Sequence, residues 1–170
     1  GEEHHFEVRR DRIAFINLPR LMDEVRLDAR VQLRMAGRVR PISGQVGPVG
    51  EFGLQYEMVP DGFEIGMGSY GSQAQSISYS LSGWEIVPSQ DLRGETLRQA
   101  MQPASDFSRA LSVLQPDYDT ITLWVYPDGF TMYRQVRDLL HERGFLVAAR
   151  PLPDGTPIRG SPSGSVSAGQ

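Results

Sequence analysis

The 170-residue chain contains no cysteine and no lysine. Without cysteine it has no disulfide, no thiolate ligand for zinc and no cysteine nucleophile. Without lysine it has no Schiff-base residue, no lysine general base and no phosphate-binding lysine, and all 17 cationic side chains are arginine. These two absences exclude several classes of enzyme before any motif is considered.

Long apolar runs are missing too. No stretch approaches the roughly 20 apolar residues of a membrane helix, and no basic segment leads into an apolar one as in a signal peptide. The net charge is −4, with acids and arginines mixed in both halves, so no basic surface indicates nucleic acid. We expect no membrane insertion by this chain and no nucleic-acid partner. The compartment stays open between the cytoplasm and, if an anchor or signal precedes the chain, the periplasm.

The length suits one domain with its own core. We predict a single α+β domain over residues 1–150, with a mixed, largely antiparallel sheet, helices packed on one face and a C-terminal β-α-β unit. Residues 151–170 are rich in Pro, Gly and Ser and poor in apolar side chains, which predicts a poorly ordered tail.

The first third of the chain combines strand and helix signals. Residues 6–16 carry β-branched and aromatic side chains on either side of a turn at Arg10, which predicts a hairpin or two short strands. Asn17 is a suitable cap for a helix over residues 18–36. Within residues 25–35 the apolar side chains also alternate as in a strand, but the many good helix formers favour the helix.

Four arginines in and just beyond this predicted helix recur every four residues and would form a ridge along one side. We interpret the ridge as a solvated surface, with an anion-binding or partner-binding stripe as the alternative. The four residues are Arg26, Arg30, Arg34 and Arg38.

The middle third, residues 41–92, lacks arginine and is rich in glycine, which is typical of strands joined by tight turns. Residues 51–59 alternate between apolar and polar side chains, the Pro-Asp-Gly at 60–62 predicts a turn, and a return strand begins in 63–67. Residues 76–88 alternate again. We predict an antiparallel section of sheet with one buried face.

The last third is more regular. Helical spacing runs through residues 94–114, with Pro103 expected to split it into two helices. A strand over 120–126, a helix over 130–144 and a strand over 145–149 then predict a β-α-β unit.

The glycines of "GMGSYG", residues 66–71, match the G-x-G-x-x-G pattern of phosphate-binding loops. A dinucleotide site requires a helix directly after the glycines, and kinase-type and P-loop sites require a lysine. Strand-like alternation follows Gly71, and the chain has no lysine, so we predict no nucleotide binding. Gly66, Gly68 and Gly71 are expected in a mobile, mostly exposed connection between two strands.

Other catalytic and metal-binding patterns are incomplete. We place His4 and His5 at an untied terminus and His141 in the last turn of a helix, so no metal site is predicted. Ser69 does not fit a nucleophile elbow, because Met67 occupies a position that requires glycine. No catalytic residue and no cofactor is assigned.

Acidic residues flank the predicted strand at 120–126: Asp117 and Asp119 precede it, and Asp128 follows it. The Pro-Asp-Gly around Asp128 fits ordinary turn chemistry, although the end of a strand that feeds a helix is also a common place for a ligand site. Arg134 and Arg150 would join Asp128 as the contacts to a ligand or a partner.

The segment from residue 119 to residue 153 resembles the closing β-α-β of the periplasmic domains of ExbD and TolR. In those domains a strand ends in an aspartate, and the following helix carries a tyrosine near its start and leads through a glycine to the last strand. Asp128, Tyr133 and Gly144 are the matching positions. The resemblance covers about a fifth of the chain and implies a non-enzymatic envelope domain that self-associates and transmits conformational change from an ion-driven motor.

Two hypotheses about function result. The leading one is a non-catalytic protein-interaction module of the bacterial envelope that binds a protein partner or a second copy of itself. The alternative is an enzyme or a small-molecule binder that recognises an anionic ligand through Asp128, Arg134 and Arg150.

Overall fold

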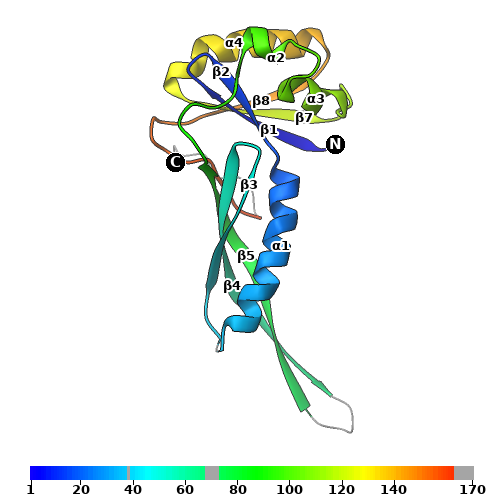
Figure 1. The fold of residues 1–170 in the computed structure, drawn as a ribbon. Helices are drawn as coiled ribbons and strands as arrows, with labels where there is room; N and C mark the ends of the chain where they lie inside the picture. Colours follow the sequence, from blue (N-terminus) through cyan, green and yellow to red (C-terminus); the bar gives the residue numbers. More distant parts are fainter. Residues whose placement is uncertain (38, 68–72, 163–170) are drawn as a thin grey trace.

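The structure is a computed structural model that describes residues 1–37, 39–67 and 73–162. It contains two sheets, a five-stranded one in the order β6-β2-β1-β7-β8 and a four-stranded one in the order β3-β4-β5-β9 (Figure 1). The predicted α+β class is confirmed. The strands that were expected in one mixed sheet are divided between a mixed sheet and an antiparallel one.

The five-stranded sheet is built around the N-terminal hairpin. β1 (Glu3–Arg9) pairs antiparallel with β2 (Arg12–Ile16), and β2 pairs with the short β6 (Glu95–Thr96). On its other side β1 pairs in parallel with β7 (Thr120–Val125), and β7 pairs in parallel with β8 (Leu146–Pro151). The predicted hairpin and the two parallel strands of the β-α-β unit are therefore present.

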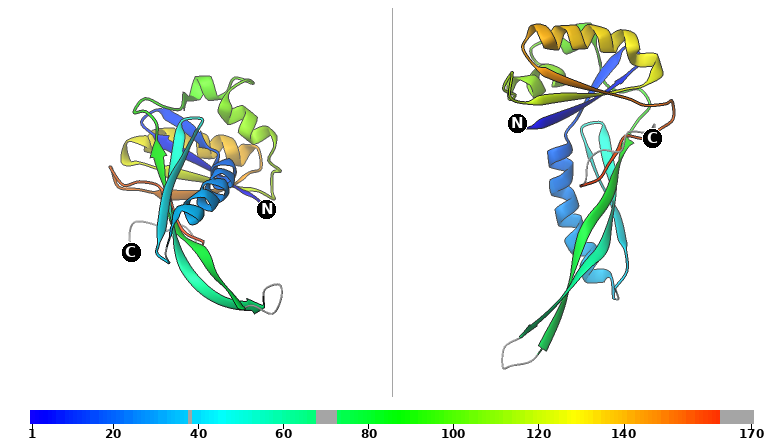
Figure 2. Two further views of the ribbon diagram at one scale, coloured as in Figure 1. Left: turned by 60° about the horizontal axis from the view of Figure 1, so that its bottom comes forward. Right: turned by 180° about the vertical axis from the view of Figure 1, so that it is seen from behind.

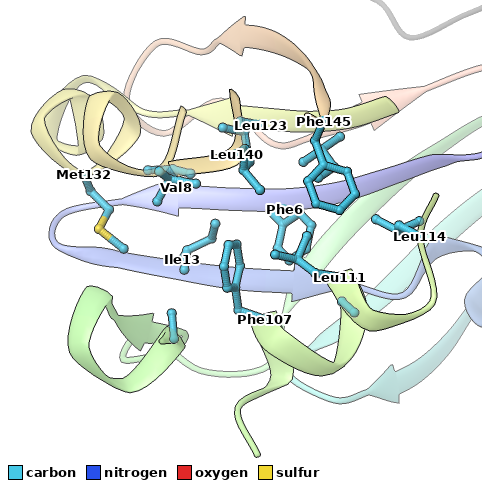
Figure 3. Close-up of a cluster of buried hydrophobic side chains, with 14 of the residues drawn as sticks. Phe6, Val8, Ile13, Phe107, Leu111, Leu114, Leu123, Met132, Leu140 and Phe145 are labelled. Atoms are coloured by element: carbon cyan, nitrogen blue, oxygen red, sulfur yellow. The ribbon is translucent and has the colours of Figure 1, made fainter. Parts of the chain in front are cut away.

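Three helices cover one face of this sheet: α2 (Leu97–Ala100), α3 (Asp106–Ser112) and α4 (Phe130–Glu142) (Figures 1 and 2). Pro103 separates α2 from α3 as predicted, and the Ser105 hydroxyl accepts a hydrogen bond from the N–H of Ser108 at 2.9 Å to cap α3. Figure 3 shows the core between the sheet and the helices, whose large members include Phe6, Val8, Ile13, Phe107, Leu123, Met132, Leu140 and Phe145.

α1 (Leu18–Met35) confirms the helical interpretation of residues 25–35. The side-chain oxygen of Asn17 accepts a hydrogen bond from the N–H of Arg20 at 3.3 Å. Leu21, Val25 and Ala29 recur every four residues and are buried, as a helix requires. A strand would place Leu27, Val31 and Met35 on the same face as Val25 and Ala29, but these three side chains are exposed.

The four-stranded sheet comprises β3 (Ile42–Val49), β4 (Phe52–Met67), β5 (Gln73–Pro88) and β9 (Arg159–Gly160). As predicted, the start of β4 buries alternate side chains on one face. Figures 1 and 2 show that β4 and β5 form a long hairpin that extends beyond α1, away from the five-stranded sheet. We call α1 with β3, β4 and β5 the arm.

The turn predicted at residues 60–62 is wrong, because β4 passes through this Pro-Asp-Gly and stays paired with β5 as far as Met67 opposite Gln73. The register shifts between Pro60 and Gly62, so a bulge absorbs the residues that are unfavourable in a regular strand. Gly66 and Met67 belong to β4. Gly68, Ser69 and Gly71 lie outside the described residues, and β5 is the strand that we predicted after the glycines.

The predicted tail begins too early. Leu152 and Ile158 are buried, the N–H of Leu152 donates to the Val125 carbonyl at 2.9 Å, and the N–H of Ile86 donates to the Ile158 carbonyl at 2.8 Å. The two apolar side chains enter a second core between the sheets, which the Pro-rich and Gly-rich composition around them obscures. Residues 163–170 lie outside the described residues.

A chain ended after Arg150 should be at least about 4 kcal/mol less stable than the full chain, because it loses two buried aliphatic side chains and their backbone pairing. Chemical unfolding of that variant and of a matched variant ended after Pro162 measures the difference. The longer variant should stay within about 0.5 kcal/mol of the full chain. Equal stability of the two variants would contradict the packing of residues 152–160.

Candidate functional site

The three residues predicted to contact a ligand have separate roles. Asp128 lies in η2 (Pro127–Gly129), where its Oδ1 accepts a hydrogen bond from the N–H of Arg10 at 3.0 Å. The Arg10 guanidinium is 4.0 Å from Oδ2 of the same carboxylate. Arg10 has a φ of 56°, a conformation that is rare for residues other than glycine. The two contacts from Asp128 stabilise this tight turn between β1 and β2.

Arg150 and Arg134 lie on opposite faces of the five-stranded sheet. The Arg150 guanidinium carbon lies 5.3 Å from the centre of the Trp124 ring, and Trp124 belongs to the core between the two sheets. Arg134 is exposed on α4, which packs on the other face through Met132, Val136 and Leu140. The structure therefore does not bring Asp128, Arg134 and Arg150 together in one site.

The prediction that His4 and His5 lie at an untied terminus is wrong, because both are buried in the central strand β1. The segment before β1 is hydrogen-bonded to the start of β7. The Thr120 N–H donates to the Glu2 carbonyl at 2.8 Å, and the Glu2 N–H donates to the Asp119 carboxylate at 2.7 Å. Sequence periodicity gave no sign of this contact, because it joins residues 117 positions apart. His141 lies in the last turn of α4, as predicted, and is exposed.

His5 is held by a buried hydrogen bond, in which Nε1 of Trp124 donates to Nδ1 of His5 at 3.0 Å. Burial is the main cause that lowers the pKa of His5. The Glu3 carboxylate opposes it, and Arg150 and His4 lower the pKa further. The neutral form, with Nδ1 as acceptor, is the form that this hydrogen bond needs. Within residues 1–37, 39–67 and 73–162, no group of three His, Asp or Glu side chains is arranged to hold a metal ion.

A buried ion pair joins β1 to the segment between β5 and β6 and was not predicted from the sequence. Nε and Nη2 of Arg93 donate to the two oxygens of Glu7 at 2.7 and 2.9 Å, and the side chains are only 7% and 3% exposed. Nη1 of Arg93 also donates to the carbonyls of Gln90 and Asp91. Arg93 thus donates to four acceptors. No pattern in the sequence indicated this pair, because Glu7 alternates with Phe6 and Val8 along β1 and would be expected to face solvent.

A pocket of about 350 Å³ lies beside this ion pair, between the sheets. Tyr126 borders it, and its hydroxyl donates to the Thr156 carbonyl at 2.6 Å, while burial raises its pKa to about 12. Glu7, Arg93 and Tyr126, which line the pocket, therefore already make hydrogen bonds within the protein.

A mainly apolar groove of about 380 Å³ lies on the arm, between α1 and the β4–β5 hairpin. Helical spacing aligns its α1 side, and the pairing of Met58 with Leu81 forms its sheet side. Arg26 and Arg30 border the groove and are exposed. We call this surface the arm groove, and its lining residues are Met22, Val25, Arg26, Ala29, Arg30, Leu33, Met58 and Leu81.

The groove exists because α1 is fixed toward β3 and leaves β5 partly uncovered. Oδ2 of Asp28 accepts a hydrogen bond from the Tyr56 hydroxyl at 2.6 Å, and Oε2 of Glu24 accepts one from the N–H of Gly47 in β3 at 3.0 Å. Burial and the Asp28 carboxylate raise the pKa of Tyr56, so its hydroxyl stays a donor. On β5, three apolar side chains of one alternating set remain only half-buried: Ile77, Tyr79 and Leu81.

Comparisons of the chain with protein-family models, with curated proteins and with solved structures found no match. The resemblance of residues 119–153 to the ExbD and TolR domains stays a prediction. No helix in the described ranges is both long and apolar enough to cross a membrane.

Breaking the Glu7–Arg93 pair should destabilise the protein strongly. Glu7→Met and Arg93→Met each leave a buried charge without its partner, which costs about 3–5 kcal/mol. The double variant removes both charges and should lose clearly less than the sum of the two single losses. Urea unfolding of the four proteins measures this coupling, and additive losses would contradict the assigned pair.

His5 should make the protein sensitive to mild acid. Its folded pKa lies below the ordinary value of 6.5, so the unfolded state binds the proton more readily and stability falls as the pH drops below about 6.5. The slope is at most about 1.4 kcal/mol per pH unit. His5→Asn keeps an acceptor for Trp124 but does not titrate, so its unfolding free energy should change less between pH 7 and pH 5. Identical slopes for the two proteins would refute the assignment.

Proposed function

We propose that this chain is a non-catalytic protein-interaction module and that the arm groove is its contact surface for another protein. The observation that carries the proposal is that α1 covers only part of one face of the four-stranded sheet. It leaves Met58 and Leu81 lining a groove. Open apolar surfaces of this kind are typical of sites where proteins bind one another.

The chemistry of the groove defines the kind of partner. Its floor is apolar, and Arg26 and Arg30 stand at its border. An amphipathic segment with apolar side chains toward the groove and acidic side chains beside them would match both features. Two of the four arginines of the predicted ridge, Arg26 and Arg30, would then form part of the partner-binding stripe that we gave as the alternative to a solvated surface. Arg34 does not line the groove, and Arg38 lies outside the described residues.

The alternative hypothesis, recognition of an anionic small molecule by Asp128, Arg134 and Arg150, has less support. Asp128 is occupied by Arg10, and the two arginines lie on opposite faces of a sheet. Association with the bacterial envelope is proposed only on the resemblance of residues 119–153. Fractionation of cells that express the full-length protein tests it, since recovery in the cytosol alone would refute it.

Photo-crosslinking tests the arm groove directly. A photoreactive amino acid in place of Leu33, which lines the groove, should give a defined crosslinked product with a different protein in native extract. The same amino acid in place of Leu27 is the matched control, because Leu27 lies on α1 outside the groove lining and is 63% exposed.

Adding Arg26→Glu and Arg30→Glu to the Leu33 probe should reduce the crosslinked product by roughly tenfold, because both charges at the border are reversed. Both substitutions fall on exposed positions of α1, so the fold should be retained. Equal products from the Leu33 and Leu27 probes, or no product from either, would count against the proposal.

A further inference from the structure

β5 has an unprotected edge. β9 pairs only with Trp84 and Glu85 of β5, and among the described residues no strand lies against Gln73–Gly83 on the side away from β4. The stretch from Gln73 to Gly83 contains no charged residue and no proline. Its backbone N–H and C=O groups on that side are therefore available to another strand.

The neighbouring edge has the protection that β5 lacks. β3 pairs with β4 only as far as Met58, so β4 is also an edge beyond that point. In this part β4 carries Pro60, Asp61 and Glu64, and its register shifts between Pro60 and Gly62. Proline, charge and a bulge are the devices by which proteins prevent strand addition, and β4 carries all three beyond Met58. Residues 73–81 of β5 carry none of them, and a bulge on β5 falls at Ser82, at the end of the unpaired stretch.

The sequence along the β5 edge is symmetric. The segment Ser76–Ser82 reads Ser-Ile-Ser-Tyr-Ser-Leu-Ser, a near palindrome centred on Tyr79. If two copies pair antiparallel with Tyr79 opposite Tyr79, Ser78 faces Ser80 and Ile77 faces Leu81. Serine then faces serine, and an apolar side chain faces an apolar side chain. Because the segment carries no charge, two copies do not repel one another.

We propose that this chain forms a symmetric dimer in which the β5 edges of two copies pair antiparallel around Tyr79. The hairpins of the two arms then make one continuous sheet, and the twofold axis passes between the two Tyr79 residues. Leu81 lines the arm groove, so Ile77 of the second copy extends the apolar wall of that groove. The evidence for the dimer is the unpaired edge of β5, and the dimer does not require another protein to bind in the groove.

The natural lack of cysteine makes the test direct. Tyr79→Cys introduces the only thiol, and directly opposed residues of an antiparallel pair have Cα atoms about 4.5–5.5 Å apart, within disulfide range. Mild oxidation should therefore yield a disulfide-linked dimer. Tyr118→Cys is the matched control: Tyr118 is 69% exposed and precedes β7 on the five-stranded sheet, and this variant should form no disulfide-linked dimer. Equal yields from the two variants would overturn the proposal.

The register is tested with two further variants. A mixture of Ser78→Cys and Ser80→Cys chains should form mainly the mixed disulfide, since these positions face one another across the axis. Equal amounts of the two homodimers and the mixed species would contradict a register centred on Tyr79.

Charge substitutions test the pairing in the cysteine-free protein by sedimentation velocity. Ser78→Asp with Ser80→Asp places like charges opposite one another twice, which should raise the dimer dissociation constant by roughly tenfold or more. Ser78→Lys with Ser80→Asp places opposite charges there and should restore the dimer. Circular dichroism of both variants checks that the fold is retained. A monomeric wild-type protein over the whole concentration range, or equal dimerisation of both variants, would overturn the proposal.

Discussion

The attachment of α1 to the β3 side of the four-stranded sheet is the constraint on which the arm depends. Asp28 and Glu24 project from one side of the helix and accept hydrogen bonds from Tyr56 and from the backbone of Gly47. Leu21, Val25 and Ala29 pack beneath. Because the helix is held over β3 and β4, it cannot also cover β5, and the inner face of the sheet stays half-open. The groove is a consequence of this off-centre position, whereas the edge of β5 is exposed because β9 pairs only with Trp84 and Glu85.

The rest of the molecule gives the arm a well-packed base. β1 is paired on both sides and buried on both faces, with Phe6 and Val8 packed under the helices and Glu7 directed toward the second sheet. The Glu7–Arg93 pair connects that strand with the segment that follows β5. Leu152 and Ile158 fill the remaining space between the sheets. A surface carried on an arm can bind a partner with precision only if its base does not move.

Local patterns in the sequence were sufficient for most elements, because they depend on neighbours in the chain. Helical spacing identified α1 and α4, and alternation identified the start of β4 and most of β5. The errors concern contacts between distant residues. The burial of His4 and His5 depends on β7, the order of residues 152–160 depends on Val125 and Ile86, and the passage of β4 through Pro60 depends on its pairing with β5. The sheet side of the groove was hidden for the same reason, since only the register brings Met58 beside Leu81.

The central claim is that the β5 edge of the arm is a contact surface, at which a second copy of this chain pairs. Amide hydrogen exchange of the unmodified chain over a range of concentrations tests it most directly, because exchange reports protection residue by residue. The account predicts that exchange slows with concentration at Ser76–Ser82 on β5, while the five-stranded sheet is unchanged. Concentration-dependent protection confined to the five-stranded sheet and its helices, or no change anywhere, would contradict the account.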